Sequence, residues 1–169
     1  MCSAPKIIIL QEEDLYYMGL ALDEAQKSFS EGEVPVGAVI VLNGRVIGKG
    51  RNSVEKEHDP TFHAEMVAIR EATSNVENWR LSGATLYVTL EPCTMCIGAI
   101  ILARIERLVF ACSDPKAGAV GSLYNITAEG RLNHKVLVTS GVRASESSDM
   151  LKSFFKKLRD VKKNGRQTL

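Results

Sequence analysis

Two cysteines near the middle of the chain have the spacing of a metal site or a redox pair. Cys93 and Cys96 follow Pro92 in the stretch EPCTMC, between the apolar runs ATLYVTL and IGAIILA. At the start of a helix, side chains three residues apart lie on the same side, so both sulfur atoms can reach one point. The pair alone is compatible with a redox couple, a metal site or two thiols buried in a core.

A histidine and a glutamate upstream help to distinguish these alternatives. His63 stands in the stretch TFHAE, at an expected helix start after a proline turn, and Glu65 follows two residues later. Residues two apart do not share a face within a helix, so both can serve one site only if it lies beyond the helix N-terminus. Redox pairs need neither residue, and the pattern therefore favours a metal site.

His63, Cys93 and Cys96 together would supply three ligands to zinc. Two thiolates and a neutral imidazole leave the fourth tetrahedral position open to water, which is typical of catalytic zinc sites. Two helix N-termini would favour the thiolates and a hydroxide. Zinc lowers the pKa of water from roughly 15.7 to about 7, so hydroxide becomes available at neutral pH. Glu65 is then the expected base that takes the proton of the water and the acid that returns it.

The composition is that of one globular domain of ordinary size. The chain has 169 residues, of which 45% are hydrophobic and 24% charged, and its formal net charge is +1. The apolar stretches are shorter than the roughly eighteen residues that span a bilayer, so no membrane association is expected. With no apparent signal peptide and no need for disulfides at this length, we expect a reducing cytoplasm.

Charge is unevenly distributed despite the small net charge. Basic residues gather near the C-terminus: Lys152, Lys156, Lys157, Arg159, Lys162, Lys163 and Arg166. Such a run is typical of the solvated face of a helix, and contact with a polyanion is the alternative interpretation.

Hydrophobic periodicity and turn signals predict the elements that position these residues. We expect a helix capped by Asp14 and ended by Gly32, a hairpin over 34–50 with its turn at Asn43-Gly44, a helix over 59–75 opened by Asp59-Pro60-Thr61, a strand over 84–90, a helix with Pro92 at its first position, strands over 107–112 and 135–141, and a basic closing helix at about 145–163. The unit of strand, helix and strand predicts two parallel strands. The expected fold is α/β, with a mixed sheet covered by helices on both faces.

The periodicity also predicts which helical residues face the core. In the first helix these are Leu15, Met18, Leu22, Ala25 and Phe29, and in the second they are Met66, Ile69 and Ala72 or Thr73. Met150, Leu151, Phe154, Phe155 and Leu158 are expected to line the closing helix.

The pattern resembles the zinc-dependent nucleobase deaminases. Their signature is H-x-E followed by P-C-x-x-C, which here reads His63-Ala64-Glu65 and Pro92-Cys93-Thr94-Met95-Cys96. Within that superfamily the chain is most similar to the bacterial tRNA-specific adenosine deaminases, from roughly Glu33 to Arg159. The stretches that carry this likeness are EVPVGAVIV, HDPT, HAE, NWRL, ATLYVTLEPCTMC, GAVGSLYN, LNH and FF. Phe62 and Cys112 depart from the family pattern, and Cys2 and Cys112 have no evident chemical role.

The resemblance implies a three-layer α/β/α fold with a five-stranded mixed sheet of the cytidine deaminase type. Residues 1–169 would form a single zinc-dependent deaminase domain. The implied reaction is hydrolytic deamination of adenosine to inosine at the wobble position of a tRNA anticodon. Hydroxide on zinc would attack C6 of adenine, and Glu65 would shuttle the protons. One Zn²⁺ per subunit, the anticodon stem-loop as partner and a homodimer are implied as well.

The same resemblance implies residues that contact the substrate. Asn52 would hydrogen-bond the target nucleoside, and the backbone at Ala64 would touch the base edge. The further positions that match pocket or flanking-nucleotide contacts are Val34, Asn133, Phe155, Arg159, Asp114 and Lys116. From the residues alone, Asn52 is equally a turn residue after a strand, and Phe155 is more typical of a core.

Two other functions share part of this pattern. A deaminase of free guanine, or of another free base or nucleoside such as cytidine, could use the same zinc site. The basic tail and the stretches GAVGSLYN and LNH favour tRNA over these substrates. The second alternative is a non-catalytic RNA-binding module, whose structural zinc would need a fourth protein ligand.

Overall fold

The sheet is built around a hairpin whose turn is formed by Asn43 and Gly44. Both residues have positive φ, 51° and 73°, as a tight two-residue turn requires. They join β1 (Gly37–Leu42) to β2 (Arg45–Arg51), and the two strands pair antiparallel. The hairpin predicted at this dipeptide is therefore confirmed.

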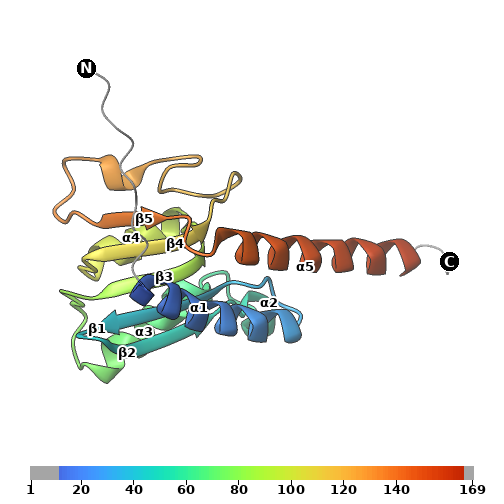
Figure 1. Ribbon diagram of the computed structural model, residues 1–169, viewed down its shortest axis with the longest axis horizontal. Coiled ribbons are helices and arrows are strands. Elements are labelled where there is room, and N and C mark those ends of the chain that lie inside the picture. Colours follow the sequence, from blue (N-terminus) through green and yellow to red (C-terminus); the bar gives the residue numbers. More distant parts are fainter. Residues whose placement is uncertain (1–11, 166–169) are drawn as a thin grey trace, which may run out of the picture.

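The computed structural model describes residues 12–165, which form a mixed sheet between two layers of helices (Figure 1). The remaining strands are β3 (Thr85–Leu90), β4 (Arg107–Cys112) and β5 (Leu137–Ser140). The helices are α1 (Glu12–Ser30), α2 (Val54–Glu57), α3 (Ala64–Asn75), α4 (Thr94–Leu102), the 3-10 helix η1 (Ile126–Ala128) and α5 (Ala144–Gly165). In the order β2-β1-β3-β4-β5, β3 is antiparallel to β1, whereas β3, β4 and β5 are parallel. The predicted five-stranded α/β/α fold is confirmed.

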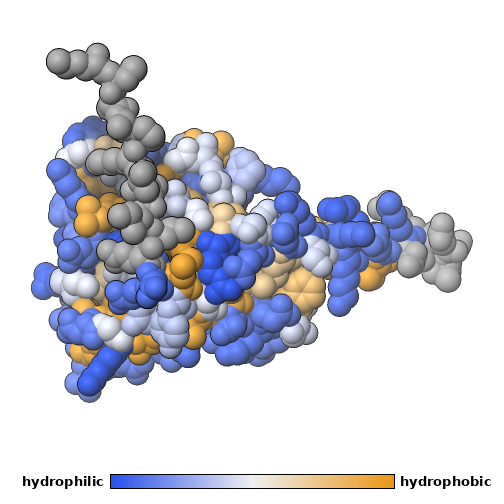
Figure 2. All heavy atoms as spheres, in the orientation of Figure 1, coloured by the Kyte–Doolittle hydropathy of each residue, from blue (hydrophilic) through white to orange (hydrophobic). Residues whose placement is uncertain are grey.

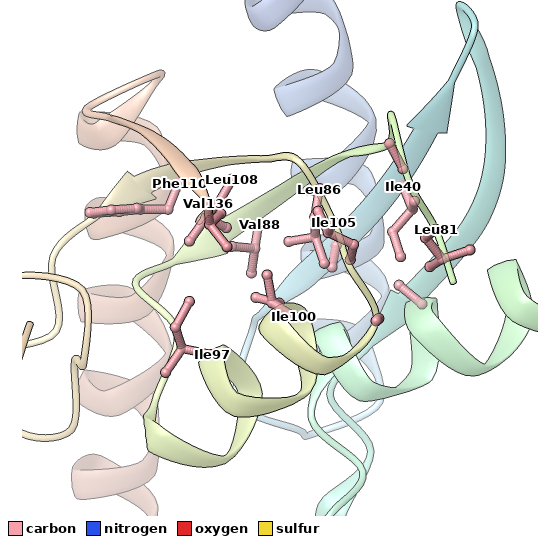
Figure 3. Packing of buried hydrophobic residues seen from close by; sticks show 14 of the residues in the cluster. Ile40, Leu81, Leu86, Val88, Ile97, Ile100, Ile105, Leu108, Phe110 and Val136 are labelled. Carbon is pink, nitrogen blue, oxygen red and sulfur yellow. The ribbon is translucent and has the colours of Figure 1, made fainter. Parts of the chain in front are cut away.

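Alternate residues of the strands face two separate hydrophobic clusters. Val39 and Val41 of β1 contact α1, in a cluster that also includes Tyr87 and Val109. Their neighbour Ile40 faces α3 and α4 on the other side. In Figure 3, Ile97 and Ile100 of α4 lie against Leu86, Val88 and Leu108 of the sheet. This second cluster supports the two helices whose N-termini carry the cysteines and His63.

Small residues allow α3 to lie unusually close to β2. A Cβ atom added at Gly50 would be 2.1 Å from the carbonyl oxygen of Ala64, and one at Gly48 would be 2.4 Å from that of Ala68. The buried face of α3 therefore consists of Ala64, Ala68 and Ala72, together with Glu65. The predictions for Ala72, which is buried, and for Ile69, which is half-buried and packs against the core cluster, are confirmed. Met66 was also predicted on the inner side, but it is only half-buried and is not part of that cluster, because only small side chains fit where α3 meets β2.

The predicted helix starts need correction in three places. Asp14 lies inside α1, where its buried carboxylate accepts hydrogen bonds from Arg107 and Tyr87 instead of capping the helix. Asp59 does not open α3, because its carboxylate accepts from the Thr61 N–H in the preceding turn and His63 is the N-cap. Pro92 is not the first residue of α4, because it precedes the N-cap residue.

Other predicted core positions of α1 are mostly confirmed. Met18, Leu22 and Ala25 are buried, and Phe29 is half-buried against Phe154 of α5. Leu15 is 40% exposed and was wrongly predicted to face the core, because the inward direction at this turn is taken by Asp14, Tyr17 and Met18.

Helix α5 begins on the sheet and then projects beyond it (Figure 1). Phe154 is buried against the body, whereas Phe155 and Leu158, also predicted to line the core, are 42% and 40% exposed. Figure 2 shows hydrophilic residues along the projecting part and hydrophobic ones at its base. Arg166 of the basic tail and Cys2 lie outside the described residues.

Among residues 12–165, no helix combines the length and the apolar composition needed to cross a membrane. That residues 1–169 form a single domain remains a prediction.

Candidate active site

The N-termini of α3 and α4 meet at a cluster of one imidazole and two thiols. His63 is the N-cap of α3 and Cys93 the N-cap of α4, both with extended backbone and without a side-chain capping hydrogen bond. Their side chains are thus free to approach each other. His63 Nδ1 lies 3.7 Å from Cys93 Sγ and 3.5 Å from Cys96 Sγ. In the part of the chain that the structure describes, these three residues form the one group of three or more His, Cys, Asp or Glu side chains able to hold a metal, with ligand atoms within 4.8 Å of one another.

The chemistry of this cluster fits zinc. The thiol of Cys96 and then the ring of His63 lower the pKa of Cys93 to about 4, although burial opposes its ionisation. Cys93 in turn raises the pKa of Cys96, because a thiolate at Cys93 and burial both disfavour a second negative charge at Cys96. A divalent cation between the sulfur atoms would relieve this repulsion, since metal coordination deprotonates thiols.

Glu65 lies in the first turn of α3, beside the cluster. The residue is only 4% exposed, and its burial raises the pKa of the carboxyl above the ordinary range. A raised pKa brings a carboxyl closer to the operating pH of an enzyme, where it can both take and return a proton. The position of Glu65 at the helix N-terminus agrees with the placement expected from the spacing of His63 and Glu65.

A cleft of about 280 Å³ opens over these groups. Its lining includes His63, Glu65 and Cys93, and the walls contain apolar side chains such as Val36 and Leu90. Four of the residues expected to contact substrate line the same cleft: Asn52, Ala64, Val34 and Asp114. An arrangement of a metal site, a protonatable carboxyl and an apolar cleft can hydrolyse a small, flat group that enters it.

A second groove adjoins the cleft and shares Val34, Leu90 and Asp114 with it. This groove runs between the segment after β4 and α5, and it brings together Lys116, Phe155 and Arg159, three more of the expected contacts. Its lining also includes Lys152, which the sequence had suggested only as part of a basic helix face.

Asn133 is not brought together with the other expected contacts. Its side-chain oxygen accepts a hydrogen bond of 2.8 Å from Nη1 of Arg104, just beyond the C-terminal end of α4. The metal ligands lie at the opposite end of that helix. The substrate roles of Asn133 and of the seven residues in the cleft and groove remain predictions.

The structure adds a buried glutamate that sequence reasoning did not assign. Glu91 accepts hydrogen bonds from the backbone N–H groups of Asp114, Val120 and Ser122, and from the Ser122 hydroxyl. Burial opposes ionisation of Glu91, but these donors outweigh it and lower its pKa. Glu91 therefore fixes the segment that carries Asp114 to the end of β3. A charged residue directly after a buried strand and before Pro92 was the available sequence signal.

The two departures from the family pattern lie outside the metal cluster. The guanidinium carbon of Arg70 lies over the ring of Phe62, 4.8 Å from the ring centroid. Phe62 lines a different hollow from the cleft. Cys112 lies in the wall of the second groove, with its sulfur 3.5 Å from the carbonyl oxygen of Thr89 and 3.4 Å from the hydroxyl of Ser147.

Comparison with known proteins agrees with this geometry. Residues 11–112 match the family model of the cytidine and deoxycytidylate deaminase zinc-binding region. The chain is 49% identical to the tRNA-specific adenosine deaminase of Bacillus subtilis (strain 168) over 157 residues, which cover 93% of this chain and 98% of that protein.

Among solved structures, the chain is more similar to a tRNA deaminase than to a guanine deaminase. A structure from studies of A-to-I editing by tRNA:A34 deaminases at the wobble position of transfer RNA has a TM-score of 0.78 and 47% identity, over 80% of this chain and 99% of that one. The guanine deaminase of Bacillus subtilis has a TM-score of 0.57 and 37% identity, over 62% of this chain and 66% of that one. The likeness to the tRNA deaminase thus extends over more of the chain.

Proposed function

Because the chain belongs to the cytidine and deoxycytidylate deaminase zinc-binding family, and within it to the tRNA-specific adenosine deaminases, we infer that it is a hydrolase that converts adenosine to inosine at the wobble position of a tRNA anticodon. The observation that carries this function is the placement of Glu65 in one cleft with His63 and Cys93. The 49% identity to a tRNA-specific adenosine deaminase extends over 93% of the chain, and it narrows the substrate from nucleobases in general to adenosine in tRNA.

We propose that His63, Cys93 and Cys96 hold one zinc ion per subunit. Zinc bound there supplies a Lewis acid that makes hydroxide available from water near neutral pH. Glu65 takes one proton from the attacking water and delivers it to the ring nitrogen next to C6. It then takes the second proton, from the new hydroxyl on C6, and gives it to the exocyclic amine, which leaves as ammonia. The reaction replaces the C6–N bond by a C6–O bond and releases ammonia. Burial of Glu65 keeps its pKa high enough for the carboxyl to act in both directions.

The residues around the cleft are proposed to bind the target nucleoside. Asn52 and the backbone of Ala64 would hydrogen-bond it, while Val34 contributes an apolar wall. In the adjoining groove, the exposed ring of Phe155 and the cation of Arg159 suit a flanking base and phosphate of a single strand. An anticodon loop is already unpaired, so turning its adenosine into the cleft requires little free energy.

We further propose a cytoplasmic homodimer. The cytoplasmic location is proposed because the tRNA substrate is found there. The dimer is supported by large apolar side chains that one subunit leaves exposed, among them Leu102 at 66% and Leu137 at 62%.

The function is tested by incubating the protein with an anticodon stem-loop RNA and detecting inosine by mass spectrometry. Free guanine and cytidine are assayed beside it, and a Glu65→Gln variant serves as the control for contaminating activity. We expect inosine in the RNA and no turnover of the free compounds. Deamination of guanine or cytidine without inosine in the RNA would contradict the proposal and favour a free-base or nucleoside deaminase. Ammonia release from none of the three would favour the non-catalytic alternative.

A further inference from the structure

A second buried glutamate, Glu33, lies against the residue proposed to hold the nucleoside. Glu33 is 2% exposed and lines the cleft together with Asn52. Its Oε2 accepts a hydrogen bond of 3.1 Å from Nδ2 of Asn52. Its carboxylate also accepts from the backbone N–H groups of Glu55 and Lys56, at 3.3 and 2.8 Å. One carboxylate therefore connects the amide of Asn52 to the start of α2.

The backbone of Asn52 is held independently of this contact. Its N–H donates to the carbonyl oxygen of Val36 at 3.0 Å, and its carbonyl oxygen accepts from the hydroxyl of Ser28 at 2.8 Å. The main chain at this position is thus fixed on both sides. The freedom that remains to Asn52 is the rotation of its side chain, including the two orientations that exchange amide nitrogen and oxygen.

Hydrogen-bond chemistry selects one of these two orientations. A carboxylate only accepts hydrogen bonds, so the amide nitrogen of Asn52, and not its oxygen, must face Glu33. Among the described residues, none donates a hydrogen bond to Oδ1 of Asn52. Every fully buried side-chain nitrogen or oxygen of those residues does have a hydrogen-bond partner. Oδ1 is therefore accessible, and since Asn52 lines the cleft, it is presented to whatever occupies the cleft.

We propose that Glu33 is a positioning residue that fixes the amide orientation of Asn52 and thereby selects the nucleoside group that Asn52 can bind. In this orientation, Oδ1 pairs with a hydrogen-bond donor of the ligand, such as a ribose hydroxyl, and the second N–H is left for an acceptor. The inference rests on the proposed function in one respect, namely that Asn52 contacts the substrate.

The competing explanation is that Glu33 only orders the start of α2. The variant Glu33→Gln separates the two roles, because an amide has nearly the same shape as the carboxylate. Its oxygen is expected to keep the shortest of the three hydrogen bonds, 2.8 Å from the N–H of Lys56. Its NH₂ group then takes the place of Oε2, where it faces the N–H of Glu55 and Nδ2 of Asn52. Two donors then oppose each other, and Asn52 must turn its oxygen away from the cleft.

The kinetic test is a double-mutant cycle of Glu33→Gln and Asn52→Ala, with Glu31→Gln as the matched control. Glu31 lies two residues away, on the side of Arg51, and does not line the cleft. We expect Glu33→Gln to lower kcat/KM for the stem-loop about tenfold, mainly through KM, because one oriented hydrogen bond is lost. In the Asn52→Ala background the same change should cost less than about twofold, since positioning acts through Asn52. An equal loss in both backgrounds would overturn the proposal.

The second test needs no activity. In ¹⁵N-labelled protein, the side-chain NH₂ signal of Asn52 is identified by its absence from the Asn52→Ala spectrum. We expect one of its protons to exchange slowly with solvent in the wild type and in Glu31→Gln, and to lose this protection in Glu33→Gln. Unchanged protection in Glu33→Gln would overturn the proposal. If the wild type forms no inosine while the NMR result is as expected, the proposed function fails and the positioning role stands.

Discussion

The close contact between α3 and β2 predicts that the substitution Gly50→Ala damages the metal site from a distance. The new Cβ would lie 2.1 Å from the carbonyl oxygen of Ala64, whereas real Cβ atoms keep at least 3.0 Å, so α3 and β2 must move apart by about 0.9 Å at that point. His63, the residue before Ala64, must follow. Zinc tolerates deviations of only about 0.2 Å in its ligand distances, so this displacement should lower zinc affinity at least tenfold.

The same substitution should also lower stability. Forcing extra atoms into a packed interface costs about 1–3 kcal/mol. For a chain of this length, each kcal/mol lowers the unfolding temperature by roughly 2–4 °C. Competition with a chromophoric chelator measures the zinc affinity, and thermal unfolding of the zinc-free protein measures the packing effect separately. The control is Gly130→Ala, because a Cβ at Gly130 meets no atom within 4 Å. Wild-type zinc affinity in Gly50→Ala would refute the coupling of helix position to the metal site.

Three further predictions concern single residues. Glu65→Gln should lower turnover by about 10²–10⁴-fold while metal analysis still finds zinc; near-normal turnover would rule out Glu65 as the proton carrier. Hydrogen bonds from Arg107 and Tyr87 outweigh burial and lower the pKa of Asp14 below its ordinary value of 3.8. Its contribution to the free energy of unfolding is therefore fully present above pH 3.8 and is lost as the pH falls through the lower folded-state pKa. In denaturant unfolding between pH 6 and pH 2, the free energy of unfolding should fall less for Asp14→Asn than for the wild type. Identical pH profiles for the two proteins would contradict this assignment. Phe155→Ala should weaken stem-loop binding by about 1–3 kcal/mol in titrations, whereas unchanged binding would exclude stacking on this ring.

The residues of the metal cluster were predictable because their spacing is local. Cys93 and Cys96 are three residues apart, and His63 and Glu65 are two apart, so each pair requires only a helix start to bring its side chains to one side. That the two helix starts converge depends on the parallel pairing of β3 and β4, which the unit of strand, helix and strand predicted, and on the order of the strands in the sheet, which the sequence did not predict.

Positions that depend on contacts between distant segments were not predictable in the same way. Asp14 looks like a helix cap in sequence, but its partner Arg107 is 93 residues away. The inner face of α3 was predicted from hydrophobicity, whereas the distance to Gly48 and Gly50 of a separate strand decides it. Glu33 and Glu91 each accept hydrogen bonds from backbone N–H groups far along the chain. The position of Glu91 directly after a buried strand is a local signal, but nothing near either glutamate in the sequence indicates which segment it binds.

The attachment of the segment from Asp114 to Ser122 to Glu91 has a consequence for how this fold can diverge. Glu91 is two residues from Cys93, and it holds that segment mainly through main-chain N–H groups, which nearly every amino acid provides. Most exposed side chains of the segment can therefore be exchanged without disturbing its anchor. The exceptions are Ser122, whose hydroxyl also donates to Glu91, and Gly118, where any Cβ would meet the Glu91 carboxylate; Ala119 and Val120 are buried in the core. New substrates can thus be accommodated at the rim of the cleft while the reacting groups beneath it keep their positions.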